Sequence, residues 1–331
     1  MDFRLEVARS LQFDRVFGAD ASQQAVYADC AGPLVDALFE GRHGCMFAFG
    51  QTGAGKTYSM LGAEGGQRRA CHDGVLPLAT QAVFRRVAQL EAEGSAQYQL
   101  RCSFVEVWRE RVYDLLAGGG AGGAGGARCA LKLRELADGS VAAVGAREHA
   151  VCSVAQLLAL VGAGAAQRAT AGTAVHAHSS RSHALLTLTL ERRWRPEGAT
   201  DPRTVRTQSG RLSLVDLAGS EGMARAHGGA GDSDGIATNL GLHVLGRVVT
   251  ALAAANRAAG GAAGAAGAAA AHVPYRDSTL TRLLQPALSG DCQTQLLACV
   301  SPAAADLGET ARALRYAAAA RGLRLGMKAI I

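Results

Sequence analysis

Hydrophobic and polar positions alternate along the chain with two different periods. Short apolar runs typical of buried strands occur at 45–49, 98–108, 183–191, 211–219 and 295–300. Between them, apolar residues recur with helical spacing at 23–39, 75–92, 153–161, 240–254, 278–288 and 308–321. Because strands and helices alternate, we expect an α/β fold in which helices cover both faces of a central sheet.

Two stretches of low complexity interrupt this pattern. Segments 118–127 and 253–271 consist mainly of glycine and alanine. Such sequences bury too little apolar surface to offset the entropy cost of ordering the chain. We therefore expect two flexible surface insertions within a single domain that covers residues 1–331, and no domain boundary at either place.

Composition narrows the class of protein only slightly. The 331 residues are 49% hydrophobic, which allows one large core, and the formal net charge of +6 favours an acidic partner. No apolar run suits a membrane span and no C-x-x-C pair occurs among the 8 cysteines. We expect a soluble intracellular protein without membrane insertion, whose cysteines are mostly buried free thiols.

The segment GQTGAGKT, residues 50–57, matches the phosphate-binding pattern G-x-x-x-x-G-K-[ST] in full. It follows an expected strand and precedes a helical segment, and a chance match is disfavoured because lysine is rare in this chain. Its glycines let backbone N–H groups converge on phosphate oxygens, Lys56 brings a charge to the outer phosphates, and Thr57 offers a hydroxyl to Mg²⁺. The predicted nucleotide-binding residues are Gly50, Gln51, Thr52, Gly53, Ala54, Gly55, Lys56, Thr57 and Tyr58.

A second motif, LVDLAGSE at 214–221, supplies an acid at the end of an apolar run. The carboxylate of Asp216 can hold the water shell of Mg²⁺, and the backbone N–H of Gly219 can contact a γ-phosphate. An isolated aspartate at this place would more simply be a turn or cap residue. Its occurrence together with the phosphate-binding pattern favours the functional interpretation.

A third motif, HSSRSH at 178–183, places hydroxyls and an arginine just before an expected strand. Ser179 and Ser180 can reach Mg²⁺ and the γ-phosphate, and Arg181 is available for a carboxylate partner. The nearby histidines have no supporting cysteine or acid cluster, so a metal site built on them is disfavoured.

Together these segments resemble the motor domain of the kinesin superfamily. The resemblance rests on FAFGQTGAGKTYSM (47–60), HSSRSHALLTL (178–188), LVDLAGSE (214–221) and HVPYRDSTLTRLLQPALSG (272–290), in this order, and spans about residues 11–324. It implies a P-loop NTPase fold with a mixed sheet between helices. It also implies a microtubule-stimulated ATPase that binds Mg²⁺ and ATP, has the microtubule (tubulin) as its partner, and works on the cytoskeleton in the cytoplasm.

The resemblance also implies roles for individual residues. The loops around 180 and 219 would act as switches that close on the γ-phosphate, joined by a salt bridge between Arg181 and Glu221. The implied catalytic residues are Ser179, Ser180, Arg181, Gly219 and Glu221, and the implied Mg²⁺ residues are Thr57, Ser180 and, through water, Asp216. Arg276 and Arg282 match basic positions of the tubulin-facing surface, although a solvated helix face would look the same.

Several positions depart from the family pattern. Kinesin motor domains open with a strand carrying R-x-R-P, which is not found here, so we expect a gap inside the sheet and a weaker adenine site. His176 stands where the family has asparagine, and Leu240 and Thr279 stand where it has lysine. Few basic residues lie between 222 and 271, so binding to an acidic track should be weak and sensitive to salt.

Three functions remain open at this point. The first is an ATP-hydrolysing microtubule motor domain, and the second is a kinesin-like microtubule- or partner-binding protein whose ATPase cycle has decayed. The third, an unrelated P-loop NTPase acting on nucleic acid, is disfavoured because no arginine and aromatic stripe for base stacking is present.

Overall fold

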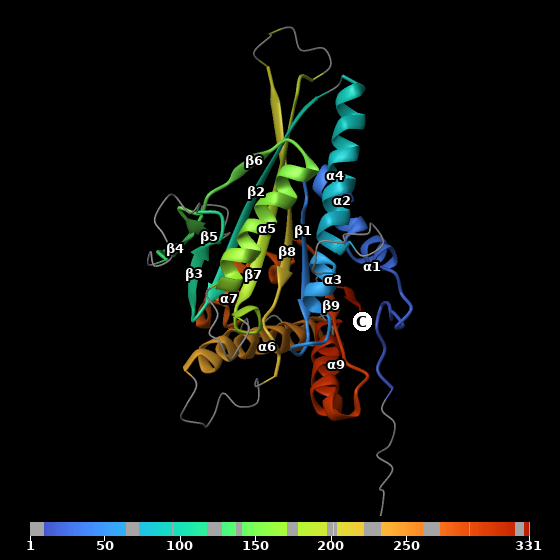
Figure 1. The fold of residues 1–331 in the computed structure, drawn as a ribbon, viewed down its shortest axis with the longest axis vertical. Coiled ribbons are helices and arrows are strands. Elements are labelled where there is room, and N and C mark those ends of the chain that lie inside the picture. The colour runs from blue at the N-terminus through green and yellow to red at the C-terminus, as the bar shows by residue number, and fades with distance from the viewer. Residues whose placement is uncertain are drawn as a thin grey trace, which may run out of the picture.

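The computed structural model describes residues 10–63, 73–94, 96–117, 128–136, 141–170, 178–196, 201, 204–221, 233–260, 272–290, 292–321 and 328–330. Within these ranges, one mixed sheet lies between two layers of helices (Figure 1), which confirms the expected α/β architecture. None of the described helices is long and apolar enough to cross a membrane.

The sheet has ten strands among the described residues. They are β1 (His43–Phe49), β2 (Gln97–Trp108), β3 (Arg111–Asp114), β4 (Ala130–Glu135), β5 (Val141–Val144), β6 (His149–Val151), β7 (His183–Trp194), β8 (Arg206–Asp216), β9 (Cys292–Ala298) and β10 (Lys328–Ile330). Their order is β10-β9-β1-β8-β7-β2-β3-β4-β5, and β6 pairs with β2. The runs expected as strands all form strands. Strands β3 to β6 were not predicted from the apolar pattern, because they are short and partly exposed.

The expectation of a gap inside the sheet is wrong for the described residues. Every neighbouring pair in the order from β10 to β5 is hydrogen bonded. β1 runs parallel to both β8 and β9, and β10 pairs in parallel with the other side of β9 through Lys328, Ala329 and Ile330. The backbone groups on both sides of β1 are therefore paired within the sheet.

Helices connect and cover the strands. They are α1 (Gln23–Cys30), α2 (Gly32–Phe39), α3 (Lys56–Leu61), α4 (Val75–Ala92), α5 (Val154–Thr170), α6 (Ser233–Gly260), α7 (Thr279–Leu283), α8 (Gln285–Ser289) and α9 (Leu307–Arg321). Short 3₁₀ turns lie at η2 (His178–Arg181), η3 (Tyr275–Asp277) and η4 (Ala304–Asp306).

Two expected helices are each divided in the structure. The segment 23–39 breaks at Ala31, because Pro33 near the start of α2 has no N–H to continue the helical hydrogen bonds. The segment 278–288 breaks at Leu284, just before Pro286. In both places apolar spacing continues across the break, so periodicity alone did not reveal it.

The two glycine- and alanine-rich segments have different outcomes. Helix α6 continues to Gly260, so the first part of 253–271 is helical and the expectation of a flexible insertion is wrong there. Alanine has the highest helix propensity, which explains why the helix extends into this stretch. Residues 261–271 and the whole of 118–127 lie outside the described ranges.

The core is divided into two layers by the sheet. Because successive strand residues face opposite sides, β7 sends Leu186 and Leu188 into the layer under α1, α2, α4 and α5, and Leu185 into the layer with α6, α7 and α9. The cysteines expected to be buried divide as well. Those at 30, 45, 102, 292 and 299 are buried, and Cys129 and Cys152 are exposed.

The close contact between β8 and the α2–β1 connection can be tested at Gly210. A Cβ there would collide with the carbonyl oxygen of Leu38, so Gly210→Ala should lower the free energy of unfolding by about 1–3 kcal/mol in urea titrations. Gly162→Ala in α5 is the matched control, because a Cβ at that position meets nothing within 4 Å. The control should stabilise by roughly 0.5–1 kcal/mol. Equal stability of Gly210→Ala and wild type would contradict the described packing.

Candidate functional site

The phosphate-binding pattern forms a tight loop between β1 and α3. Gly50, Gly53 and Gly55 have φ angles of 148°, 82° and 95°, which residues with a Cβ rarely adopt. A Cβ at Gly50 would also collide with the carbonyl oxygen of Cys299, so this side of the loop lies against the end of β9. Nothing lies within 4 Å of a Cβ built at Gly53 or Gly55. The other side of the loop therefore has room for a ligand beside its backbone.

Lys56 begins α3 and is folded back over this loop. Its side chain is 8% exposed, and its ammonium group donates hydrogen bonds to the carbonyl oxygens of Gly50 at 2.9 Å and Gln51 at 2.8 Å. Burial lowers the pKa of Lys56, and the negative charges of Asp216 and Glu221 oppose this effect. These two hydrogen bonds fix the positive charge of Lys56 beside the phosphate-binding loop.

The predicted Mg²⁺ residues Thr57 and Asp216 meet at the same edge of the sheet. Because β1 and β8 are parallel neighbours, the loop after β1 and the last residue of β8 lie side by side. The Thr57 hydroxyl donates to Oδ2 of Asp216 at 3.1 Å, and Oδ1 of Asp216 is buried with no hydrogen-bond partner among the described residues. An unpaired buried carboxylate oxygen beside a hydroxyl fits a hydrated Mg²⁺ ion.

Arg168 in α5 is a site residue that the sequence did not indicate. The residue is 6% exposed, and its guanidinium group donates to Oδ2 of Asp216 at 3.0 Å, to the Ser182 hydroxyl at 3.0 Å and to the Ser182 carbonyl at 2.7 Å. It also lies 3.9 Å from the buried carboxylate of Glu106, which accepts a hydrogen bond from Arg128 at 2.5 Å. Arg168 therefore fixes the aspartate at the end of β8 relative to the segment that enters β7.

The two predicted switch loops contact each other and the phosphate-binding loop. The N–H of Gly219 donates to the carbonyl of Ser180, and the N–H of Ser220 donates to the carbonyl of Gly50, each at 3.0 Å. The sequence assigned the Gly219 N–H to a γ-phosphate, and in this arrangement a protein carbonyl accepts its hydrogen bond. The three segments thus form one connected unit around the open side of the loop.

Glu221 has a different partner from the one expected. Its carboxylate accepts hydrogen bonds from the backbone N–H of Thr52 at 2.8 Å and from the Thr52 hydroxyl. The predicted ion pair between Glu221 and Arg181 is not among the ion pairs that the described residues form in this arrangement. Glu221 instead joins the second switch loop to the phosphate-binding loop.

The other predicted site residues surround this centre. Ser180 and Arg181 lie in η2 directly before β7, and the side chain of Ser179, like the whole of His176, lies outside the described part of the chain. Tyr58 is 47% exposed on α3, and its carbonyl accepts a hydrogen bond from Gln23 of α1 at 2.9 Å.

The predicted track-binding arginines lie on a separate surface around η3 and α7. Arg276 is 79% exposed and pairs with Glu135 of β4 at 3.1 Å. Nearby, Arg247 of α6 pairs with Asp277 at 2.9 Å. By contrast, Arg282 makes no ion pair or side-chain hydrogen bond with any residue that the structure describes. The basic residues of this surface could be found from the sequence. Their ion pairs could not, and the structure shows that Arg276 and Arg247 each pair with an acid of the same chain.

Comparisons with known proteins agree with this geometry. The family model for the kinesin motor domain matches residues 4–323. The chain is 36% identical over 335 residues to kinesin-like protein KIN-4A of Gossypium hirsutum, covering 95% of this chain and 31% of that protein. It is 35% identical over 321 residues to kinesin-like protein KIF27 of Rattus norvegicus, covering 96% and 22%. The chain thus spans less than a third of the length of either relative.

Solved structures show the same similarity in three dimensions. A KIF14 dimer in the two-heads-bound state, with AMP-PNP and in complex with a microtubule, matches with a TM-score of 0.77 and 36% identity over 92% of this chain and 78% of that chain. A fast kinesin matches with a TM-score of 0.76 and 32% identity, covering 96% and 81%. With the phosphate-binding loop, both switch segments and the fold all in agreement, this chain belongs to the kinesin motor domain family.

Proposed function

We propose that this chain is an ATP-driven microtubule motor domain that couples ATP binding and hydrolysis to its contact with the track. The observation that carries the proposal is the open phosphate-binding loop with Lys56 folded over it, beside the unpaired oxygen of Asp216. The KIF14 structure with AMP-PNP on a microtubule supports the choice of ligand and partner. A decayed ATPase cycle is not favoured, because Lys56, Thr57 and Asp216 are all in place.

The residues of the loop would bind the β- and γ-phosphates of ATP. Backbone N–H groups at the open side of Gly53 and Gly55 and the ammonium of Lys56 would neutralise phosphate charge. Thr57, Ser180 and, through water, Asp216 would hold Mg²⁺, which supplies further charge neutralisation when bound. Arg168 keeps Asp216 in place by a buried ion pair, so the carboxylate needs no reorganisation during the reaction.

The contacts between the loops suggest how the site would sense the nucleotide. The N–H of Gly219 can serve either the carbonyl of Ser180 or a γ-phosphate oxygen, but not both at full strength. Glu221 likewise occupies Thr52 of the phosphate-binding loop in this arrangement. Exchange of these hydrogen bonds on phosphate binding would release the loop at 219–221 from its present contacts. Helix α6, which follows this loop in the sequence, packs beside α7 on the surface of Arg282.

ATP turnover with and without microtubules tests the proposal directly. We expect phosphate release by the purified chain to rise when microtubules are added. Lys56→Ala should reduce turnover by roughly 100-fold, because it removes the cation that faces the transferring phosphate. Circular dichroism should first show that both proteins are folded. If wild type then releases phosphate no faster than Lys56→Ala, the proposed ATPase activity is rejected.

Arg168→Gln tests the positioning of Asp216. Loss of the guanidinium leaves the carboxylate of Asp216 buried without its partner, so we expect destabilisation of about 3–5 kcal/mol together with reduced phosphate release. Arg168→Lys keeps a cation and should restore part of both quantities. The control Arg193→Gln removes an exposed arginine beside Glu191 on β7 and should change neither. Wild-type stability and turnover in Arg168→Gln would show that the network has no such role.

The track surface is tested by comparing its two arginines. Arg282→Ala should weaken co-sedimentation with microtubules by roughly 2–5-fold, as expected for one exposed charge contact. Arg276→Ala should weaken it less, since Glu135 already shares that charge. Arg86→Ala on α4, in the helix layer of the other sheet face, serves as the control and should leave the affinity unchanged. Equal binding by Arg282→Ala and the control would remove Arg282 from the interface.

A further inference from the structure

The sheet face that carries α6 and α9 is apolar only along part of its length. The strand register places Val105, Leu185, Val215 and Phe47 in one row across β2, β7, β8 and β1. These side chains are buried in the same layer as residues of α6, α7 and α9. Figure 1 shows α6 crossing the lower end of these strands.

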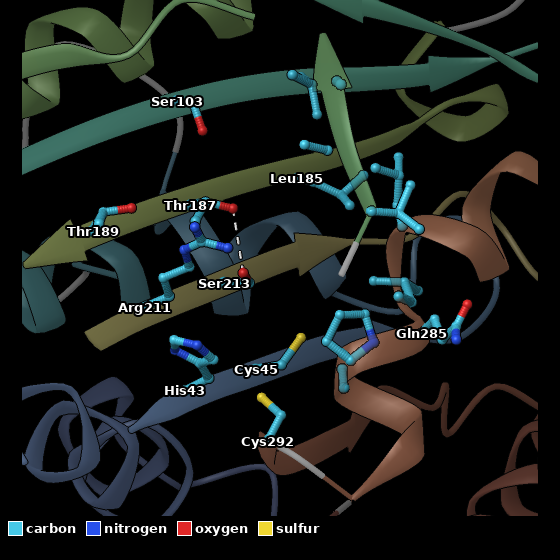
Figure 2. Close-up of a pocket in the computed structure, with 18 of the residues that line it drawn as sticks. His43, Cys45, Ser103, Leu185, Thr187, Thr189, Arg211, Ser213, Gln285 and Cys292 are labelled. Atoms are coloured by element: carbon cyan, nitrogen blue, oxygen red, sulfur yellow. Dashed lines mark hydrogen bonds between the residues drawn. The ribbon is translucent and has the colours of Figure 1, made fainter. Parts of the chain in front are cut away.

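Two residues further along each strand, the face becomes polar. The next row consists of Ser103, Thr187, Ser213 and Cys45. The hydroxyl groups of Thr187 and Ser213 lie 3.2 Å apart and hydrogen bond across β7 and β8 (Figure 2). Cys45 belongs to the buried apolar cluster, whereas the hydroxyls of the other three strands leave a shallow floor with hydrogen-bonding capacity.

The row after that contains two arginines. Its members are Arg101, Thr189, Arg211 and His43, again aligned by the register of β2, β7, β8 and β1. Along this face the character thus changes from apolar, through hydroxyl and thiol groups, to cationic within a distance of two strand repeats. The opposite face shows no such gradient, because Leu186, Leu188, Leu190, Leu212 and Leu214 continue its apolar layer.

A cavity of about 600 Å³ lies over this floor. Its apolar wall comes from α7, α8 and β5 and includes Leu283, Leu284, Pro286, Ala287 and Val141. The volume is typical of pockets that enclose small molecules. The cavity lies at the start of β1, away from the phosphate-binding loop at its end, and none of the predicted nucleotide-binding residues lines it. It is therefore separate from the candidate nucleotide site.

Arg211, which is exposed, supplies one positive charge at the polar end. Its guanidinium group forms no ion pair and no side-chain hydrogen bond with the described residues, and Figure 2 shows the side chain running across the sheet towards Thr187. Glu148 also lines the cavity, and its carboxylate lies 3.9 Å from Arg101, which lies at the same distance from the carboxylate of Glu191. An unpaired guanidinium beside two hydroxyls, next to an apolar wall, is complementary to a carboxylate with an apolar tail.

We propose that this cavity binds a small monocarboxylic acid with an apolar tail. Its carboxylate accepts hydrogen bonds from Arg211 and from one hydroxyl of the Thr187–Ser213 pair, the one whose proton is not used in the hydrogen bond between them, and its tail lies against Leu284 and Pro286 of the apolar wall. The inference concerns a second site and does not depend on ATP hydrolysis at the first.

Octanoate is a suitable probe, measured by isothermal titration calorimetry with the whole chain. We expect saturable binding by wild type and a loss of at least tenfold in affinity in Arg211→Gln, because a charge-assisted contact is removed. Arg206→Gln is the matched control, since Arg206 is exposed on the same strand and does not line the cavity. It should bind octanoate as wild type does, and octanol should bind more weakly than octanoate.

Lys56→Ala separates this site from the phosphate-binding loop, which could also attract a carboxylate. Full octanoate affinity in that variant supports the second site, and a loss there assigns the binding to the loop and overturns the proposal. Absence of saturable binding by wild type, or equal affinity in Arg211→Gln and Arg206→Gln, also overturns it. Octanol binding as tight as octanoate would show an apolar cavity without a carboxylate subsite, and so reject the assignment of Arg211.

Discussion

The parallel pairing of β1 with β8 on one side and β9 on the other is the constraint on which the rest of the structure depends. Hydrogen bonds continue beyond both ladders, from Leu217 N–H to the Ala48 carbonyl at 3.2 Å and from Cys299 N–H to the Phe49 carbonyl at 2.7 Å. The phosphate-binding loop therefore starts between two fixed strand ends. One of them supplies Asp216, and the other supports the loop from behind through Cys299.

A network of buried charges completes this arrangement from outside the loop. Arg168 loses most of its hydration, and its hydrogen bonds with Asp216 and Ser182 and the nearby charge of Glu106 help to offset that cost. Such a network stabilises little compared with an apolar core of the same size, but it defines where each charged group lies. Its position between α5, β2 and β8 ties the outer helix layer to the edge of the sheet at which the nucleotide would bind.

The two faces of the sheet differ in the polarity of their side chains. One face carries a continuous apolar layer of leucines in its centre and packs against α1, α2, α4 and α5. The other is apolar only where α6, α7 and α9 cover it, and Ser103, Thr187 and Ser213 line it beyond them. Here these polar groups line a cavity together with residues of α7, α8 and β5.

The sequence by itself determined the local features of this protein. Glycines with positive φ, a lysine and a threonine at fixed spacing lie within one short segment, so the phosphate-binding loop was visible from residues 50–57 alone. The central strands and the helix at 75–92 were visible for the same reason, since their periodicity needs only neighbouring residues. Breaks at Ala31 and Leu284 were missed because apolar spacing runs across them.

Only the tertiary structure decided which distant groups meet. Arg168 and Asp216 are 48 residues apart, and Thr52 and Glu221 are 169 apart, so no local pattern could pair them. The row of Ser103, Thr187 and Ser213 exists only through the register of β2, β7 and β8, because each residue alone is an ordinary polar position on a strand. Contacts of this kind depend on strand order and register, which side-chain periodicity along the chain does not encode.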